Sequence, residues 1–161
     1  VQNFLYGDAA CSVLKLADFG LSQLILDGNV LSSVCGSPAF MAPEMMLKQG
    51  YDFKIDLWAL GVTFFMVMYN ALLVGRSKMN VSEMKDAIKD PAAGQRALAL
   101  ATNKANASSE GVKELKLAAI DLIGKLTLRE PAQRLSAKQA LKEKFVAWTY
   151  ANEEEIAFIQ T

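Results

Sequence analysis

The chain has 161 residues, with 17 lysines and arginines against 17 aspartates and glutamates. This length predicts one domain or a large piece of one. The balanced charge excludes a strong overall field, so we expect neither nucleic acid nor a membrane surface as a partner. The hydrophobic share of 52% exceeds that of a typical soluble domain and fits either a membrane segment or part of a larger core.

Histidine is absent from the sequence, and Cys11 and Cys35 are its only cysteines. Two thiols this far apart form neither a CxxC zinc site nor a disulfide framework. They predict a reduced intracellular setting, with the cytoplasm expected first and the nucleus as the alternative. The lack of histidine removes the usual general base and the usual Ser/His or Cys/His nucleophile systems. Any chemistry must therefore rest on carboxylates, amides and a bound metal.

The first predicted element is a short hairpin. Residues 4–6 and 13–16 alternate partly between apolar and polar side chains around a turn-like Gly7-Asp8-Ala9. The second strand runs directly into Asp18-Phe19-Gly20. Residues 21–43 then lack a sustained period, which predicts a long loop, and a loop of that length in a compact domain is usually functional.

A short helix over residues 44–49, ended by Gly50, is predicted next. Residues 57–75 hold no charged side chain. By length alone such a run is a candidate membrane span. The alternative is a core helix over residues 56–68, apolar all round because protein covers every face, with Tyr69-Asn70 breaking the run.

The second half of the chain predicts further helices. Asp90-Pro91 indicates a helix stop, while residues 90–111 are rich in Ala, Asn, Ser and Gly and carry little signal. Ser136 and Gln139 form a capping box that opens a helix, and the last stretch, around residues 148–155, predicts another. Before them, apolar residues at helical spacing predict an amphipathic helix: Val112, Leu115, Ala119, Leu122, Ile123 and Leu126.

Two tripeptides stand at the ends of the long loop. Asp18-Phe19-Gly20 follows a predicted strand, and Ala42-Pro43-Glu44 stands at a helix start. Each is weak alone, because a tripeptide recurs by chance. Their order and context resemble the eukaryotic protein kinases, in which D-F-G and A-P-E bracket the activation loop. Gly36-Ser37-Pro38 between them favours Ser/Thr kinases, especially calcium/calmodulin-dependent-like ones.

Three more stretches agree with this resemblance. Residues 56–61, Asp-Leu-Trp-Ala-Leu-Gly, resemble the D-x-W-x-x-G that opens the long central helix of the family, which makes a membrane span improbable. Residues 131–136 resemble P-x-x-R-x-[ST], and Asn3 resembles the asparagine that closes H-R-D-x-x-x-x-N. The resemblance implies a mainly α kinase C-lobe, with a short hairpin before a helical body, over residues 1–147, and a C-terminal helical tail over residues 148–161.

The resemblance also implies roles for individual residues. Asp18 and Asn3 are expected to be the catalytic metal ligands, holding the two Mg²⁺ ions that bridge the phosphates of ATP. The alternative is that Asp18 caps a turn and Asn3 is a polar residue before a strand. Ser33, with Ser32 as its neighbouring alternative, is expected to be an activating phosphosite whose charge orders the loop. Both could instead be ordinary loop serines. Ser37 is expected to face the bound protein substrate.

Three further residues are expected to be structural. Glu44 and Arg134 resemble the buried pair that joins the end of the activation segment to the late helical region, a role that suits the planar fork of arginine. The alternative is two unrelated surface charges. Asp56 is expected to bind the backbone of the catalytic loop.

The sequence also departs from the family pattern. It contains no Gly-rich loop, strand lysine or H-R-D motif and does not begin with methionine, so we expect the N-lobe and the catalytic base to lie upstream. Residues 70–78 lack the usual Gly-x-x-Pro-Phe, and residues 90–111 match poorly.

The leading hypothesis is a Ser/Thr protein kinase that transfers the γ-phosphate of ATP to protein hydroxyls. The isolated fragment is expected to be inactive, because half of the positioning groups are absent from it. The alternative is a non-catalytic, pseudokinase-like binding module. The presence of Asp18 and Asn3 favours the first, since a binding module needs no magnesium ligands.

Overall fold

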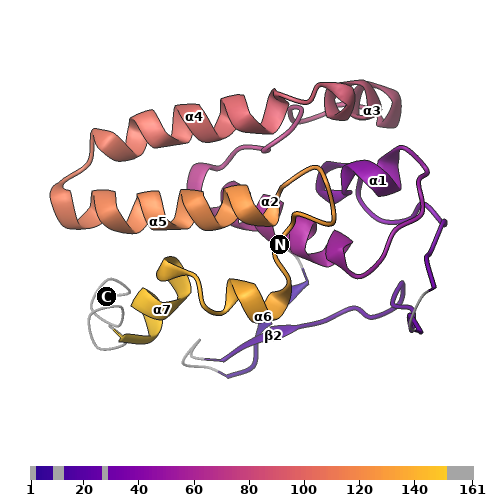
Figure 1. Cartoon of the computed structure of the whole chain (residues 1–161), viewed down its shortest axis with the longest axis horizontal. Coiled ribbons are helices and arrows are strands. Elements are labelled where there is room, and N and C mark those ends of the chain that lie inside the picture. Colours follow the sequence, from indigo (N-terminus) through magenta and orange to yellow (C-terminus); the bar gives the residue numbers. More distant parts are fainter. Residues whose placement is uncertain (1–2, 9–12, 27–28, 152–161) are drawn as a thin grey trace.

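A computed structural model of the chain describes its residues in three stretches, 3–8, 13–26 and 29–151. Figure 1 shows a mainly helical body, with a small two-stranded hairpin along its lower edge. The predicted fold class is confirmed.

The hairpin pairs strand β1 (Phe4–Tyr6) with strand β2 (Leu14–Leu16) in antiparallel register, so that Phe4 lies opposite Leu16. The predicted hairpin is confirmed, although β2 begins one residue later than expected. A two-stranded sheet of this size is only marginally stable by itself.

The predicted long loop is also confirmed. It ends in a single turn of 3₁₀-helix, η1 (Pro38–Phe40), which is followed by the short helix α1 (Pro43–Met46). Pro43 stands at the first position of α1, where its missing N–H costs nothing. The helix is shorter than predicted, because the chain turns away at Lys48, whose φ of 59° is left-handed.

Helix α2 (Lys54–Tyr69) is the centre of the core. Its side chains Trp58, Val62 and Phe65 are buried among residues of α1 and the later helices. The helix ends where Asn70 takes a left-handed φ of 50° and donates its N–H to the carbonyl of Met66. The core-helix alternative is confirmed, and within the described part of the chain no helix has the length and apolar character to cross a membrane.

Three helices follow: α3 (Val81–Lys89), α4 (Ala93–Asn106) and α5 (Glu110–Leu126). The helix stop predicted at Asp90-Pro91 and the amphipathic helix predicted around α5 are both confirmed. Sequence reasoning found no helix where α4 lies. Figure 1 shows α4 lying along α5, and α5 also packs against α2.

Burial of alanine explains α4. Ala101 and Ala105 are 2% and 0% exposed at the interface of this helix with the rest of the body. Small side chains let two helix backbones approach closely, and most helical stability in proteins comes from such packing. The spacing of Ala97, Ala101 and Ala105 was the signal in the sequence that could have revealed the helix.

The chain closes with α6 (Ala137–Ala140) and α7 (Lys144–Ala151). The predicted capping box is confirmed: the N–H of Ser136 donates to Oε1 of Gln139 at 2.8 Å, and the N–H of Gln139 donates to Oγ of Ser136 at 3.3 Å. The last predicted helix is present through Ala151. Its continuation through Glu153–Glu155 lies outside the described residues.

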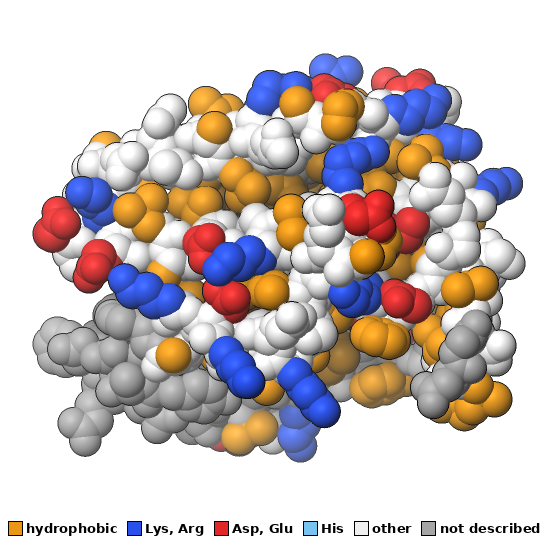
Figure 2. Space-filling model, viewed as in Figure 1, with side chains coloured by type: hydrophobic (Ala, Val, Ile, Leu, Met, Phe, Trp, Pro, Cys, Tyr) orange, Lys and Arg blue, Asp and Glu red, His pale blue; other side chains and the backbone are white. Residues whose placement is uncertain are grey.

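The hairpin and the loop keep large apolar side chains exposed, whereas the buried hydrophobic core lies in the helical body. Leu24 is 87% exposed. Figure 2 shows hydrophobic side chains along the lower right edge, where Figure 1 places the loop after β2. The high apolar share of the sequence therefore lies partly on this surface: Leu5, Tyr6, Val13, Leu14, Leu16, Phe19, Leu21, Leu24, Leu26 and Val30.

Candidate functional site

The hairpin brings Asn3 next to the residues that leave β2. The N–H of Ala17 donates to the carbonyl of Asn3 at 2.8 Å, which continues the pairing of the two strands by one step. Asp18 follows Ala17 directly, and both Asn3 and Asp18 are exposed. Asn3 and Asp18 therefore lie at the same end of the hairpin, on its two different strands' extensions.

The backbone of Asp18 is strained. Its φ of 63° lies in the left-handed region, which non-glycine residues seldom occupy although Asp tolerates it better than most. Its carboxylate accepts the N–H of Gly20 at 3.3 Å, so the side chain is drawn toward the turn that follows. Strained residues of this kind gather at functional sites.

The side chains of Asn3 and Asp18 suit Mg²⁺ better than a metal ion whose ligands all come from the protein. Mg²⁺ is usually bound through one or two carboxylates together with water and substrate phosphates. Asp18 offers one carboxylate and Asn3 one amide oxygen. Across the described stretches, no group of three or more His, Cys, Asp or Glu side chains could hold a metal by itself. An ion here would take its remaining oxygens from water or phosphate.

A second part of the site is an open cleft of about 170 Å³ at the end of the loop. Ser37 lies at this cleft and is exposed, and Asp56 from the first turn of α2 lies there too. The structure thus brings together two predicted site residues. Sequence reasoning missed the apolar residues that line the cleft, because they form no local motif: Cys35, Phe40, Met41, Met45, Ile55 and Ala59.

Asp56 brings a carboxylate to this cleft. Burial raises the pKa of its carboxyl above the ordinary value of 3.8. One side of the residue is open to solvent, but no described residue donates a hydrogen bond to its carboxylate. A carboxylate in this position has unused capacity to accept N–H donors from a group that enters the cleft.

We expect Asp56→Asn to raise the melting temperature at pH 7. A raised folded pKa means that the ionised carboxylate costs stability above that pKa, while near and below the unfolded value of 3.8 the cost vanishes. The gain should therefore shrink as thermal unfolding is repeated from pH 7 down to pH 4. Asp86→Asn is the control, and its expected effect on the melting temperature is the opposite one. A hydrogen bond from Lys89 lowers the pKa of Asp86, so the ionised carboxylate contributes stability that the substitution removes. A gain for Asp56→Asn that is independent of pH would rule out burial as its cause.

The structure also places the two loop serines. Ser32 and Ser33 are both exposed. The carbonyl of Ser33 accepts a hydrogen bond from the hydroxyl of Tyr51 at 2.5 Å. Sequence reasoning missed Tyr51, which belongs to no motif and contacts the loop only in the folded chain.

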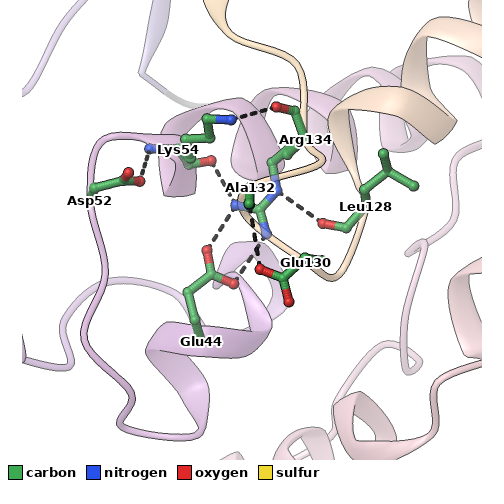
Figure 3. Close-up of polar contacts among 7 residues, drawn as sticks. All are labelled: Glu44, Asp52, Lys54, Leu128, Glu130, Ala132 and Arg134. Carbon is green, nitrogen blue, oxygen red and sulfur yellow. Dashed lines mark hydrogen bonds and ion pairs between the residues drawn. The ribbon is translucent and has the colours of Figure 1, made fainter.

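Glu44 and Arg134, which are 90 positions apart in the chain, meet in the core (Figure 3). Nη1 and Nη2 of Arg134 donate to the two carboxylate oxygens of Glu44 at 2.8 and 3.1 Å. Nη1 also donates to the carbonyl of Lys54, and Nε donates to that of Leu128. The side chains of Arg134 and Glu44 are 0% and 4% exposed. One guanidinium thus ties together α1, the start of α2 and the segment before α6.

The stretch Asp56–Gly61 places each of its distinctive residues against a different neighbour. Asp56 lies at the cleft. Trp58 is buried beneath Arg134, whose guanidinium carbon lies 5.3 Å from the ring centroid. At Gly61, an added Cβ would lie 2.6 Å from Cγ2 of Thr127, just beyond α5.

Comparison with known proteins now decides the family. The family model described as "Protein kinase domain" matches residues 1–146. The chain belongs to the protein kinase family. Along the matched residues, the Asn3–Asp18 end of the hairpin stands before the long loop, and the cleft stands at the end of that loop.

The relatives of this kinase-family chain are Ser/Thr kinases. It is 31% identical to "Serine/threonine-protein kinase ATG1c" of Arabidopsis thaliana over 138 residues, 83% of this chain and 16% of the relative. It is 32% identical to "Serine/threonine-protein kinase ULK3" of Mus musculus over 148 residues, 90% of this chain and 28% of the relative. It is 31% identical to "Calcium/calmodulin-dependent protein kinase cmkA" of Emericella nidulans over 146 residues, 90% of this chain and 32% of the relative.

The chain therefore spans a third or less of the length of these relatives. One of these relatives is a calcium/calmodulin-dependent kinase by name, which agrees with the resemblance found in the sequence. The other two kinases are identical to this chain at the same level.

Proposed function

We propose that this chain takes part in the transfer of the γ-phosphate of ATP to serine or threonine hydroxyls of a protein substrate. The observation that carries the proposal is the placement of Asn3 and Asp18 at the same end of the hairpin. Asp18 and Asn3 would hold Mg²⁺, which when bound neutralises charge on the phosphates of ATP. Phosphoryl transfer depends mostly on positioning and electrostatic stabilisation, and an exposed carboxylate beside an amide oxygen suits that role.

Ser37 is proposed to face the protein substrate. Its exposure at the cleft supports this role, because its hydroxyl can both donate and accept a hydrogen bond there. The apolar lining of the cleft would exclude water from one side of a bound peptide. Asp56, whose carboxylate accepts no hydrogen bond from the described residues, is proposed to accept main-chain N–H groups from a segment seated in the cleft.

Residues 1–161 alone should not turn over ATP. They contain no histidine and hence no H-R-D motif, so no catalytic-loop aspartate is present to accept the proton of the substrate hydroxyl. We expect the purified chain, mixed with Mg²⁺, ATP and a general protein substrate, to transfer no measurable phosphate. Asp18-dependent transfer by the chain alone would contradict this expectation.

A chimera tests the proposed function. Residues 1–146 would replace the corresponding part of the Emericella nidulans kinase, whose remaining sequence supplies the rest of a kinase. We expect the chimera to phosphorylate a general protein substrate, and Asp18→Asn to lower its rate about 100-fold or more. Asp86→Asn, at an exposed carboxylate of α3, is the matched control and should leave the rate unchanged. Equal rates for the Asp18→Asn chimera and its parent would overturn the proposal.

A binding module is the second candidate, and the exposed apolar side chains of the hairpin and loop favour it. The same chimera separates the two functions. If the chimera is folded, as judged by a cooperative melt, and is still inactive, the binding module is favoured.

A further inference from the structure

The activation loop is held at one place by the connection between α1 and α2. Leu31 and Tyr51 form a two-residue antiparallel bridge, with hydrogen bonds of 2.9 and 3.0 Å between their main chains. The hydroxyl of Tyr51 adds a third bond, to the carbonyl of Ser33 at 2.5 Å. Tyr51 thus holds both ends of residues 31–33, the short stretch that contains the two loop serines.

The hydrophobic core holds both residues of this bridge in place. Tyr51 is 4% exposed and belongs to the main hydrophobic cluster, and Leu31 is partly buried against the same cluster. The backbone also approaches closely at Gly50, where an added Cβ would lie 3.3 Å from Cγ2 of Val30. By contrast, Leu24 and Val30 are 87% and 68% exposed. Leu31 is therefore a point at which the loop joins the core before the segment that lines the cleft.

We propose that Tyr51 is a positioning residue that sets where Ser33 and the cleft residues 35–37 lie. The bond is made to the main-chain carbonyl of Ser33, so the exposed hydroxyl of that serine is left free for phosphorylation. Two residues farther on, Cys35 enters the lining of the cleft. Fixing the carbonyl of Ser33 to a buried ring therefore fixes the start of the cleft wall. The part of this proposal that concerns phosphorylation of Ser33 rests on the proposed function.

The test compares Tyr51→Phe with Tyr69→Phe in the full 161-residue chain. Both variants remove one hydroxyl from a tyrosine packed in or against the same core cluster. The hydroxyl of Tyr69 is buried without a hydrogen-bond partner among the described residues, so its loss breaks no bond. Two local rates are measured: amide hydrogen exchange in peptides covering residues 29–36, and alkylation of Cys35 by iodoacetamide. Exchange in α5 serves as the reference for global unfolding.

For Tyr51→Phe we expect both local rates to rise about 2- to 10-fold, the range set by the loss of one hydrogen bond. Exchange in α5 should change less, and Tyr69→Phe should leave both local rates near those of the parent. Equal local rates in the two variants would overturn the proposal. A rise in α5 as large as that in residues 29–36 would also overturn it, because it would show a general loss of stability rather than a local release.

Neither rate depends on phosphoryl transfer, so this result is independent of the proposed function. In an active chimera, the phosphate content of Ser33 is then compared between the parent and Tyr51→Phe. We expect Tyr51→Phe to reduce it, and an unchanged phosphate content would limit Tyr51 to a structural role.

Discussion

Replacing Arg134 by alanine is expected to lower the free energy of unfolding by about 3–5 kcal/mol, the range measured when one partner of a buried ion pair is removed. The loss leaves the carboxylate of Glu44 buried without its partner, since that side chain is only 4% exposed. It also leaves the carbonyls of Lys54 and Leu128 without their donor. Because Arg134 serves three acceptors, its loss should cost more than Glu44→Ala.

Urea unfolding of the single variants and of the double variant measures the coupling between Arg134 and Glu44. The double variant should be less destabilised than the sum of the two singles, because the second substitution removes the charge that the first left unpaired. Lys144→Ala is the control: Lys144 lies 3.4 Å from Glu114 in a pair whose side chains are 69% and 68% exposed. That pair should contribute at most about 1 kcal/mol. An Arg134→Ala cost as small as the control would contradict the role of the buried pair.

Gly61→Ala is expected to destabilise the chain by about 1–2 kcal/mol, against the usual preference of helices for alanine. Overpacking a core costs about 1–3 kcal/mol, whereas helix propensity returns about 1 kcal/mol. The overpacking should win here, because the new Cβ would lie 2.6 Å from Cγ2 of Thr127 and 3.0 Å from Cβ of Leu126. Thr127 cannot turn away freely, since its Oγ1 donates to the carbonyl of Ile123 at 2.7 Å.

Gly111→Ala is the matched control for Gly61→Ala. Gly111 lies in the first turn of α5, and an added Cβ there meets no atom within 4 Å. It should leave stability unchanged or raise it by up to about 1 kcal/mol. Thr127→Ser removes the clashing methyl and keeps the hydroxyl, so it should restore part of the stability of Gly61→Ala. If urea unfolding shows Gly61→Ala to be as stable as Gly111→Ala, the close approach of α2 and α5 does not exclude a larger side chain at position 61.

The sequence by itself indicated the family and most of the elements, because the signals involved act over short distances. The capping box at Ser136 and the stop at Asp90-Pro91 are interactions between residues a few positions apart, so they could be predicted without the fold. The same is true of the hairpin and of the uncharged run that became α2. The motifs from Asp18 to Arg134 identified a kinase because their order along the chain is itself the signal.

Only the tertiary structure decided which side chains meet. Helix α4 was missed because its alanines become informative only when Ala101 and Ala105 pack against the rest of the body. Tyr51 was missed because its three bonds to the loop join residues with no common pattern. The raised pKa of Asp56 likewise depends on burial at a cleft that the loop and two helices build together. In each case the deciding energy comes from contacts between distant parts of the chain, and local sequence rules do not contain them.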